Sequence, residues 1–279
     1  MTNLAQQILH HLKSVKILPR RILLSTPGVQ ASVPMLRGCW GAALHAANFD
    51  VYTKVFNPEN SKPPLYLLRP GPDEPRENPC LDFFLFNEAI TDDATLLKAW
   101  GKACRNGLGP NRNPFFINGY VLNSFYVEAS PDQPWNLGEA EWPLQSDPAD
   151  TPCRISFSSP LRILRNKHLI EEPTLADIVV AIHRRLDAFI PDCEAWQSLQ
   201  RDLLSLARNI SCIPWDGQRL DLVRWSSRQQ EEVEMRGVCG ELILPEGPGD
   251  LWPLLAAAQW THLGKGTIMG LGQPVITYY

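Results

Sequence analysis

LWPLLAAAQWTHLGKGTIMGLGQPVITYY, residues 251–279, contains the succession of elements that decides the fold. An apolar run over 251–263 predicts a buried helix, and PVITYY at 274–279 has the β-branched and aromatic residues typical of a strand. Four glycines fall between them within nine residues, namely Gly264, Gly266, Gly270 and Gly272. This segment therefore predicts a helix, a glycine-rich loop and a final strand.

The same ending occurs in the first half of the chain. A helix predicted over 92–105 leads into Gly107-Leu108-Gly109 and then into a strand over 115–122. The other predicted elements are strands at 20–25, 81–86, 153–158 and 237–244, and helices at 33–48, 174–189 and 194–209. Each half thus has the order of a split βαβ unit. We predict an α+β protein of two tandem ferredoxin-like (RRM-like) βαββαβ domains.

Two proline-rich stretches, 57–79 and 130–152, lack helical or strand periodicity and are interpreted as loops. The second lies near the middle of the chain. We therefore predict an N-terminal domain over 1–129, a linker over 130–152 and a C-terminal domain over 153–279.

The composition limits the classes of function. The 279 residues carry a formal net charge of −4, so a nucleic-acid partner would have to be bound by a local basic patch. There is neither a signal-peptide pattern nor an apolar run of transmembrane length, and we expect a cytoplasmic protein that contacts no membrane. The seven cysteines form no CxxC pair, and no cluster has metal-ligand spacing. We expect reduced thiols, no metal and no cofactor.

The glycine-rich segment does not fit the common nucleotide-binding loops. A dinucleotide fingerprint and a Walker A loop both lead into a helix, whereas this segment follows a helix and leads into a strand. Gly264 suits the position that ends a helix. The remaining glycines, with Lys265 and Thr267, fit either a backbone cradle for phosphate or a packed turn at a sheet edge.

Three stretches resemble a known family: PMLRGCWGAALH (34–45), LVRWSSRQQEEVEMRGVCGELIL (222–244) and the segment 251–276. They are similar to the CRISPR-associated RAMP proteins, specifically the Cas6 endoribonucleases that process precursor CRISPR RNA. The resemblance implies a RAMP-type pair of ferredoxin-like domains. It also implies that the glycine-rich loop binds RNA backbone phosphate.

Family members cut RNA without metal, by attack of a ribose 2′-OH on the adjacent phosphate. The reaction needs a base, an acid and cations. The resemblance places a catalytic histidine at the end of the first long helix, which is His45, with Tyr52 and Lys54 nearby. Arg37, Gly41 and His45 share a helix face, where Gly41 would allow a ligand or a neighbouring chain to approach.

Two alternatives remain open for this site. His45 could be an ordinary helix histidine, and some relatives rely on arginine, for which Arg37, Arg20, Arg21 and Arg224 are candidates. His262, beside the glycine-rich loop, is a second histidine candidate, although a helix C-terminus favours a cation without any catalytic role.

Local basic segments are the further candidates for RNA binding. Residues 158–168 contain Arg162, Arg165 and Lys167 without an acidic residue, and Arg224 and Arg228 flank Trp225. Arginine next to an aromatic residue can hold a phosphate and stack on a base. A solvated hairpin and a core tryptophan are the simpler alternatives.

The resemblance therefore implies a sequence-specific, metal-independent endoribonuclease. It would bind CRISPR repeat hairpins, cut precursor CRISPR RNA and keep the product as a subunit of an effector complex. The alternative is a non-catalytic RAMP subunit that binds RNA as a scaffold. In both cases the partners would be CRISPR RNA and other CRISPR effector subunits.

Overall fold

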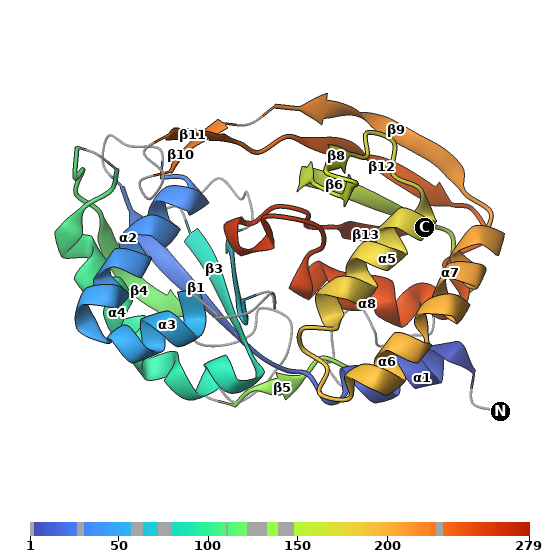
Figure 1. Cartoon of the computed structure of the whole chain (residues 1–279), viewed down its shortest axis with the longest axis horizontal. Coiled ribbons are helices and arrows are strands. Elements are labelled where there is room, and N and C mark those ends of the chain that lie inside the picture. The colour runs from blue at the N-terminus through green and yellow to red at the C-terminus, as the bar shows by residue number, and fades with distance from the viewer. Residues whose placement is uncertain are drawn as a thin grey trace. The chain divides into compact units, whose positions relative to one another are not determined.

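The computed structural model describes residues 3–26, 31–56, 64–71, 80–109, 111–121, 133–138, 148–221, 223–226 and 231–279 (Figure 1). The chain forms two compact units. The N-terminal unit comprises Lys16–Trp135 and Ile268–Gly270, and the C-terminal unit comprises Met1–Val15, Asn136–Thr267 and Leu271–Tyr279. Within the described ranges, every helix is too short or too polar to cross a bilayer.

The N-terminal unit is a ferredoxin-like βαββαβ fold. Its sheet has the antiparallel order β2-β3-β1-β4, and the short β5 also pairs with β1. Its elements are β1 (Lys16–Ser25), α2 (Val33–Ala47), α3 (Phe49–Phe56), β2 (Tyr66–Pro70), β3 (Cys80–Phe86), η1 (Asn87–Asp92), α4 (Asp93–Asn106), β4 (Phe116–Val121) and β5 (Trp135–Asn136). Helices α2 and α4 pack on this sheet, where Trp40 of α2 stacks on Trp100 of α4 with ring centroids 5.1 Å apart.

The C-terminal unit repeats this topology. Its sheet has the order β13-β6-β12-β9 and is antiparallel throughout. The elements are α1 (Leu4–Leu12), β6 (Cys153–Leu161), β7 (Leu164–Arg165), β8 (His168–Leu169), α5 (Leu175–Leu186), α6 (Cys193–Ser198), α7 (Gln200–Asn209), β9 (Ile213–Leu220), β10 (Val223–Ser226), β11 (Glu231–Glu234), β12 (Gly237–Leu244), η2 (Gly249–Leu251), α8 (Trp252–Thr261) and β13 (Val275–Tyr278). The short η3 (Thr267–Met269) is divided between the two units. The predicted pair of ferredoxin-like domains is therefore confirmed.

Several elements differ from the prediction. Strand β2 lies inside the stretch 57–79 that was interpreted as loop, because pairing with β3 and burial hold it despite the surrounding prolines. Strand β9 was missed because it is an edge strand whose side chains are mostly exposed, so it has no apolar alternation. Helix α3 was also missed, and α8 ends at Thr261 rather than beside Gly264.

The two units do not have the predicted domain boundaries, which were 1–129 for the N-terminal domain and 153–279 for the C-terminal domain. The chain passes between the units after Val15 and after Trp135. Helix α1 was predicted as part of the N-terminal domain, but Ala5, Ile8 and Leu12 bury its apolar face within the C-terminal unit. There α1 packs against α8, and Asp250 of η2 accepts a hydrogen bond from the Leu4 N–H at 3.2 Å.

Candidate functional site

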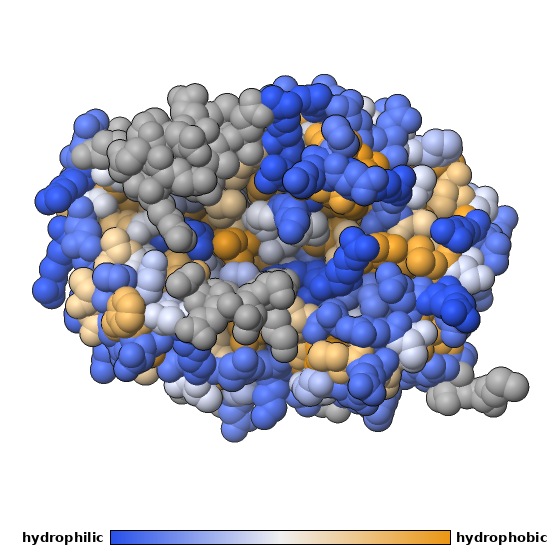
Figure 2. Space-filling view, in the orientation of Figure 1, coloured by the Kyte–Doolittle hydropathy of each residue, from blue (hydrophilic) through white to orange (hydrophobic). Residues whose placement is uncertain are grey.

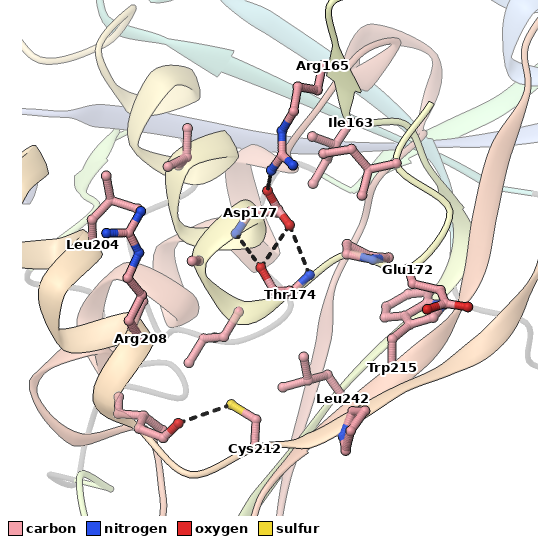
Figure 3. Close-up of a pocket in the computed structure, with 18 of the residues that line it drawn as sticks. Ile163, Arg165, Glu172, Thr174, Asp177, Leu204, Arg208, Cys212, Trp215 and Leu242 are labelled. Carbon is pink, nitrogen blue, oxygen red and sulfur yellow. Dashed lines mark hydrogen bonds and ion pairs between the residues drawn. The ribbon is translucent and has the colours of Figure 1, made fainter. Parts of the chain in front are cut away.

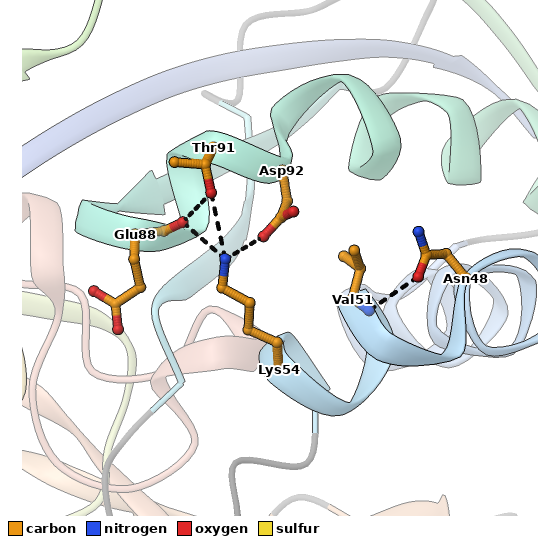
Figure 4. Close-up of polar contacts among 6 residues, drawn as sticks. All are labelled: Asn48, Val51, Lys54, Glu88, Thr91 and Asp92. Carbon is orange, nitrogen blue, oxygen red and sulfur yellow. Dashed lines mark hydrogen bonds and ion pairs between the residues drawn. The ribbon is translucent and has the colours of Figure 1, made fainter.

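His45 lies exposed in the last turn of α2, where a sharp bend begins α3. Asn48 forms the bend: its N–H donates to the Leu44 carbonyl at 2.8 Å, and its side-chain oxygen accepts the Val51 N–H at 3.1 Å (Figure 4). The bend places Tyr52 of α3 edge-on to the His45 ring, with centroids 4.8 Å apart. The structure therefore brings together two of the predicted catalytic residues.

Lys54 is held by η1, the 3-10 helix that precedes α4 (Figure 4). Its Nζ atom donates to a carboxylate oxygen of Asp92 at 2.6 Å, to the Thr91 hydroxyl at 3.3 Å and to the Glu88 carbonyl at 3.2 Å. The side chain is 42% exposed. Lys54 thus joins α3 to the start of α4, and its role as a catalytic cation stays a prediction.

Arg37 packs against aromatic rings. Its Nε donates to the Tyr66 hydroxyl at 2.7 Å, and its guanidinium lies 5.0 Å from the centre of the Phe56 ring. Phe56 also fills the space beside Gly41, where an added Cβ would lie 2.8 Å from its ring. The close approach expected at Gly41 is therefore made by α3 itself.

The two neighbouring arginine candidates are buried. Arg20 pairs with Asp93 at 2.8 Å, and Arg21 donates to the carboxylate of Asp82 at 2.6 and 3.1 Å. Both lie in the middle of β1 and not at a strand start, because the strand begins at Lys16. Their charges are neutralised in the interior, and they are poorly placed to meet a ligand.

The glycine-rich segment forms a packed turn. Gly264, Gly266, Gly270 and Gly272 all have φ between +65° and +83°, a range that L-residues with a Cβ rarely adopt. The Leu263 N–H donates to the Gly272 carbonyl at 3.0 Å, and the Gly272 N–H donates to the Pro160 carbonyl at 3.0 Å. The packed-turn alternative therefore accounts for the glycines.

One edge of this turn remains accessible to a ligand. Lys265 is exposed, whereas Thr267, Gly270 and Gly272 are buried. The Lys265 N–H donates to the Arg162 carbonyl at 2.8 Å, which joins two candidates that lie about a hundred residues apart in the sequence. In the part of the chain that is described, the buried Nε of Arg162 has no hydrogen-bond partner. Binding of phosphate by this group stays a prediction.

The basic run 158–168 contains the end of β6 and an exposed β7–β8 hairpin. Its turn residues, Asn166 and Lys167, both have positive φ. Arg165 pairs with Asp177, the residue that completes the capping box of α5 (Figure 3). This arrangement matches the solvated hairpin that was the simpler alternative. Lys167 stays exposed as an RNA-binding candidate.

The second basic segment is described only in part. Arg224 lies in β10, paired with Val233 of β11, and Trp225 is paired with Glu232. Arg228 lies outside the described residues. RNA binding by Arg224 and Arg228 stays a prediction.

His262 is fully buried and holds the glycine-rich turn. Its Nδ1 lies 3.1 Å from the Leu271 carbonyl, and its own φ is +54°. It is the C-cap of α8, but its burial removes it from contact with an RNA phosphate.

Cys39 and Cys153 are buried cysteines that form no disulfide. Burial raises the pKa of Cys39 and of Cys153 to about 11, so these thiols are protonated and unreactive at neutral pH. Within the described ranges, no group of three His, Cys, Asp or Glu residues is arranged to hold a metal ion.

One residue at the site was missed by the sequence analysis. Phe49, the first residue of α3, is 60% exposed, and its ring lies edge-on to His45 at 5.2 Å. An aromatic residue four positions after a candidate catalytic histidine is the signal that could have identified it.

The decisive comparison concerns the half that contains the glycine-rich turn. Residues 155–274 match the family model of CRISPR-associated endoribonuclease Cas6. This segment, which is under half of the 279 residues, is similar to the Cas6 family. Among curated proteins, no sequence matches it significantly.

Solved Cas6 structures share the whole fold. The product complex of Cas6 (TTHB231), a Thermus thermophilus protein, has a TM-score of 0.61 and 14% identity, covering 95% of this chain and 100% of the other. The Cas6 (TTHA0078) product complex has a TM-score of 0.60 and 18% identity, covering 94% and 99%. A Cas6-RT-Cas1–Cas2 complex has a TM-score of 0.57 and 13% identity, covering 95% of this chain and 29% of the other. At these identities the likeness is one of fold.

Proposed function

We propose that this chain is a Cas6 endoribonuclease, which binds CRISPR repeat RNA and cuts precursor CRISPR RNA into mature guides. The family match and the solved Cas6 product complexes support this assignment. The observation that carries it is His45, exposed at the end of α2 and bracketed by aromatic rings. An exposed imidazole is a group that can act as a general acid or base on a bound RNA.

The proposed reaction uses no metal. The 2′-oxygen loses its proton to a base and attacks the adjacent phosphorus, and the 5′-oxygen leaves with a proton from an acid. The products are a cyclic phosphate and a 5′-hydroxyl. His45 performs one of these two proton transfers, and Tyr52 shares the site through its ring contact with His45. Arg37, bound to the Tyr66 hydroxyl, and Lys54, paired with Asp92, are the proposed cations for the charge that develops on the phosphate.

RNA binding on the C-terminal unit is assigned to the accessible edge of the glycine-rich turn. Lys265 and Arg162 lie together there, and Gly264 and Gly266 beside Lys265 are half-buried. Lys167 is a further exposed cation of this unit, and Arg224 on β10 is proposed as another RNA contact. We propose that these contacts retain the cut product, so that the protein remains as a subunit with other CRISPR proteins. Solved complexes that join Cas6 to Cas1–Cas2 support such partners.

The test is cleavage of a labelled repeat RNA in EDTA, beside copies with one 2′-deoxy substitution at each position in turn. We expect a single cut that is lost when one particular 2′-OH is removed. His45→Ala should lose at least about a hundredfold in the cleavage rate, because a general acid or base contributes about 10²–10⁴-fold. His10→Ala is the matched control, since His10 is an exposed histidine of the other unit. Equal rates for the two variants would refute the role of His45.

One observation favours the non-catalytic alternative. Lys54, the candidate cation on the helix that follows His45, is already paired with Asp92. In the scaffold alternative the protein binds the repeat tightly and cuts no RNA, with or without divalent metal. The cleavage assay, run beside a filter-binding titration, separates the two alternatives.

A further inference from the structure

A series of aromatic rings runs from the core of the N-terminal unit to its surface. Trp100 stacks on Trp40 at 5.1 Å, and Trp40 contacts Phe56 at 4.7 Å. Phe56 stacks on Tyr52 at 5.3 Å and 11°, and Tyr52 lies 6.4 Å from Phe49 at 27°. Trp40 and Trp100 are fully buried, whereas Phe49 is 60% exposed. The exposed end of the series is therefore the Phe49 ring, and Tyr52 is its neighbour on the side toward the core.

Phe49 is held in place by its surroundings. The preceding residue, Asn48, is fixed by hydrogen bonds to Leu44 and Val51. The edge-on contact with His45 limits the rotation of the ring on its other side. A large apolar side chain that is both exposed and positioned in this way provides a preorganised platform for a planar apolar group.

We propose that Phe49 is a stacking platform for one unpaired nucleobase of the RNA, next to the phosphate at which His45 acts. This inference rests on the proposed function, which brings RNA to His45. The Phe49 and His45 ring centres are 5.2 Å apart, a separation that a single nucleotide spans. Every base offers a π-face, so stacking on an aromatic ring needs no particular sequence. The platform would splay the base and align the adjacent 2′-oxygen for attack.

The variants are chosen to keep the fold. Phe49→Leu keeps an apolar side chain but removes the aromatic face, and Phe49→Tyr restores it. Phe116→Leu is the matched control, because Phe116 is 55% exposed on β4 of the same unit. Circular dichroism and thermal melting should show three folded proteins with nearly equal stability.

The readout is the affinity for a repeat RNA that cannot be cut, carrying a 2′-deoxy substitution at the scissile position. Phe49→Leu should bind roughly 5- to 100-fold more weakly, the range for loss of one stacked base. Phe49→Tyr and Phe116→Leu should bind like the wild type. An abasic nucleotide moved through the repeat should weaken wild-type binding at one position. Phe49→Leu should bind that abasic RNA as tightly as it binds intact RNA, because the variant has already lost the stacking contact.

The outcomes separate this inference from the proposed function. If the wild type neither binds nor cuts the repeat RNA, the proposed function fails and this inference fails with it. If the wild type cuts but Phe49→Leu binds and cuts as well as Phe116→Leu, only the stacking inference is overturned. The exposed ring would then belong to a protein contact. The inference would also be overturned if Phe49→Leu bound every abasic RNA more weakly than it binds intact RNA. The ring would then act independently of any single base.

Discussion

The glycine-rich turn makes a quantitative prediction at Gly272. This residue has a φ of +65°, and a Cβ added there would fall well inside van der Waals distance of the Leu263 carbonyl oxygen. Placing alanine in left-handed geometry costs about 1–2 kcal/mol. Displacing the backbone also endangers the hydrogen bonds of Gly272 with Leu263 and Pro160, each worth about 0.5–1.5 kcal/mol. We therefore expect Gly272→Ala to lower the free energy of unfolding by about 2–5 kcal/mol.

Two alanine substitutions calibrate this value. Gly266 has a φ of +83°, but its added Cβ meets the end of a flexible side chain, Leu271. Gly266→Ala should therefore lose only about 1–2 kcal/mol. Gly38 lies in α2 with no atom within 4 Å of an added Cβ, so Gly38→Ala should be neutral or stabilising by up to about 1 kcal/mol.

The assay is equilibrium unfolding in urea, followed by tryptophan fluorescence, on all three variants and the wild type. The expected order of destabilisation is Gly272→Ala first, Gly266→Ala second and Gly38→Ala last. Wild-type stability for Gly272→Ala would refute the argument, because it would mean that the turn does not need its left-handed backbone. Equal losses at Gly272 and Gly266 would show that the backbone contact with Leu263 contributes nothing.

Two further predictions concern buried charge. Asp82 is fully buried and accepts hydrogen bonds from Arg21 and Arg69, so Asp82→Asn should lose about 3–5 kcal/mol in urea unfolding; a loss under about 1 kcal/mol would contradict the pairing. His183 stacks on Trp196, and burial lowers its pKa, so the unfolded chain takes up a proton below about pH 6.5 that the folded chain resists. The free energy of unfolding should therefore fall as the pH falls from about 7.5 to 5.5, and less steeply in His183→Gln; equal slopes would contradict this assignment.

The pair of ferredoxin-like folds could be predicted from the sequence, because this prediction depends on hydrophobic periodicity and on the order of helices and strands along the chain. The repeated ending of helix, glycine turn and strand identified both ferredoxin-like units, and Thr174 with Asp177 marked the start of α5 through a capping box. Elements held by tertiary contacts were missed. Strand β2 has prolines on both sides and is fixed by its pairing with β3, and β9 lacks alternation because it lies at an exposed edge.

The candidate site was predictable only in part. The family resemblance pointed to His45 and Tyr52 together, and a short bend at Asn48 brings them into contact. The surroundings of Arg21 depend on Asp82, which lies 61 residues away, so its burial was not visible in the local pattern. The four glycines were also ambiguous, since positive φ serves a packed turn as well as a phosphate cradle.

The position of α1 has a consequence for how the chain is made. This helix is synthesised before all the elements of the N-terminal unit, yet it packs against α8, which follows them in the sequence. The N-terminal unit is nearly complete by Trp135, so it can fold while the C-terminal unit is still being translated. During that interval the apolar face of α1, with Ile8 and Leu12, has no native partner in the C-terminal unit. The apolar face of α1 therefore stays uncovered by α8 until the residues between the two helices have been synthesised.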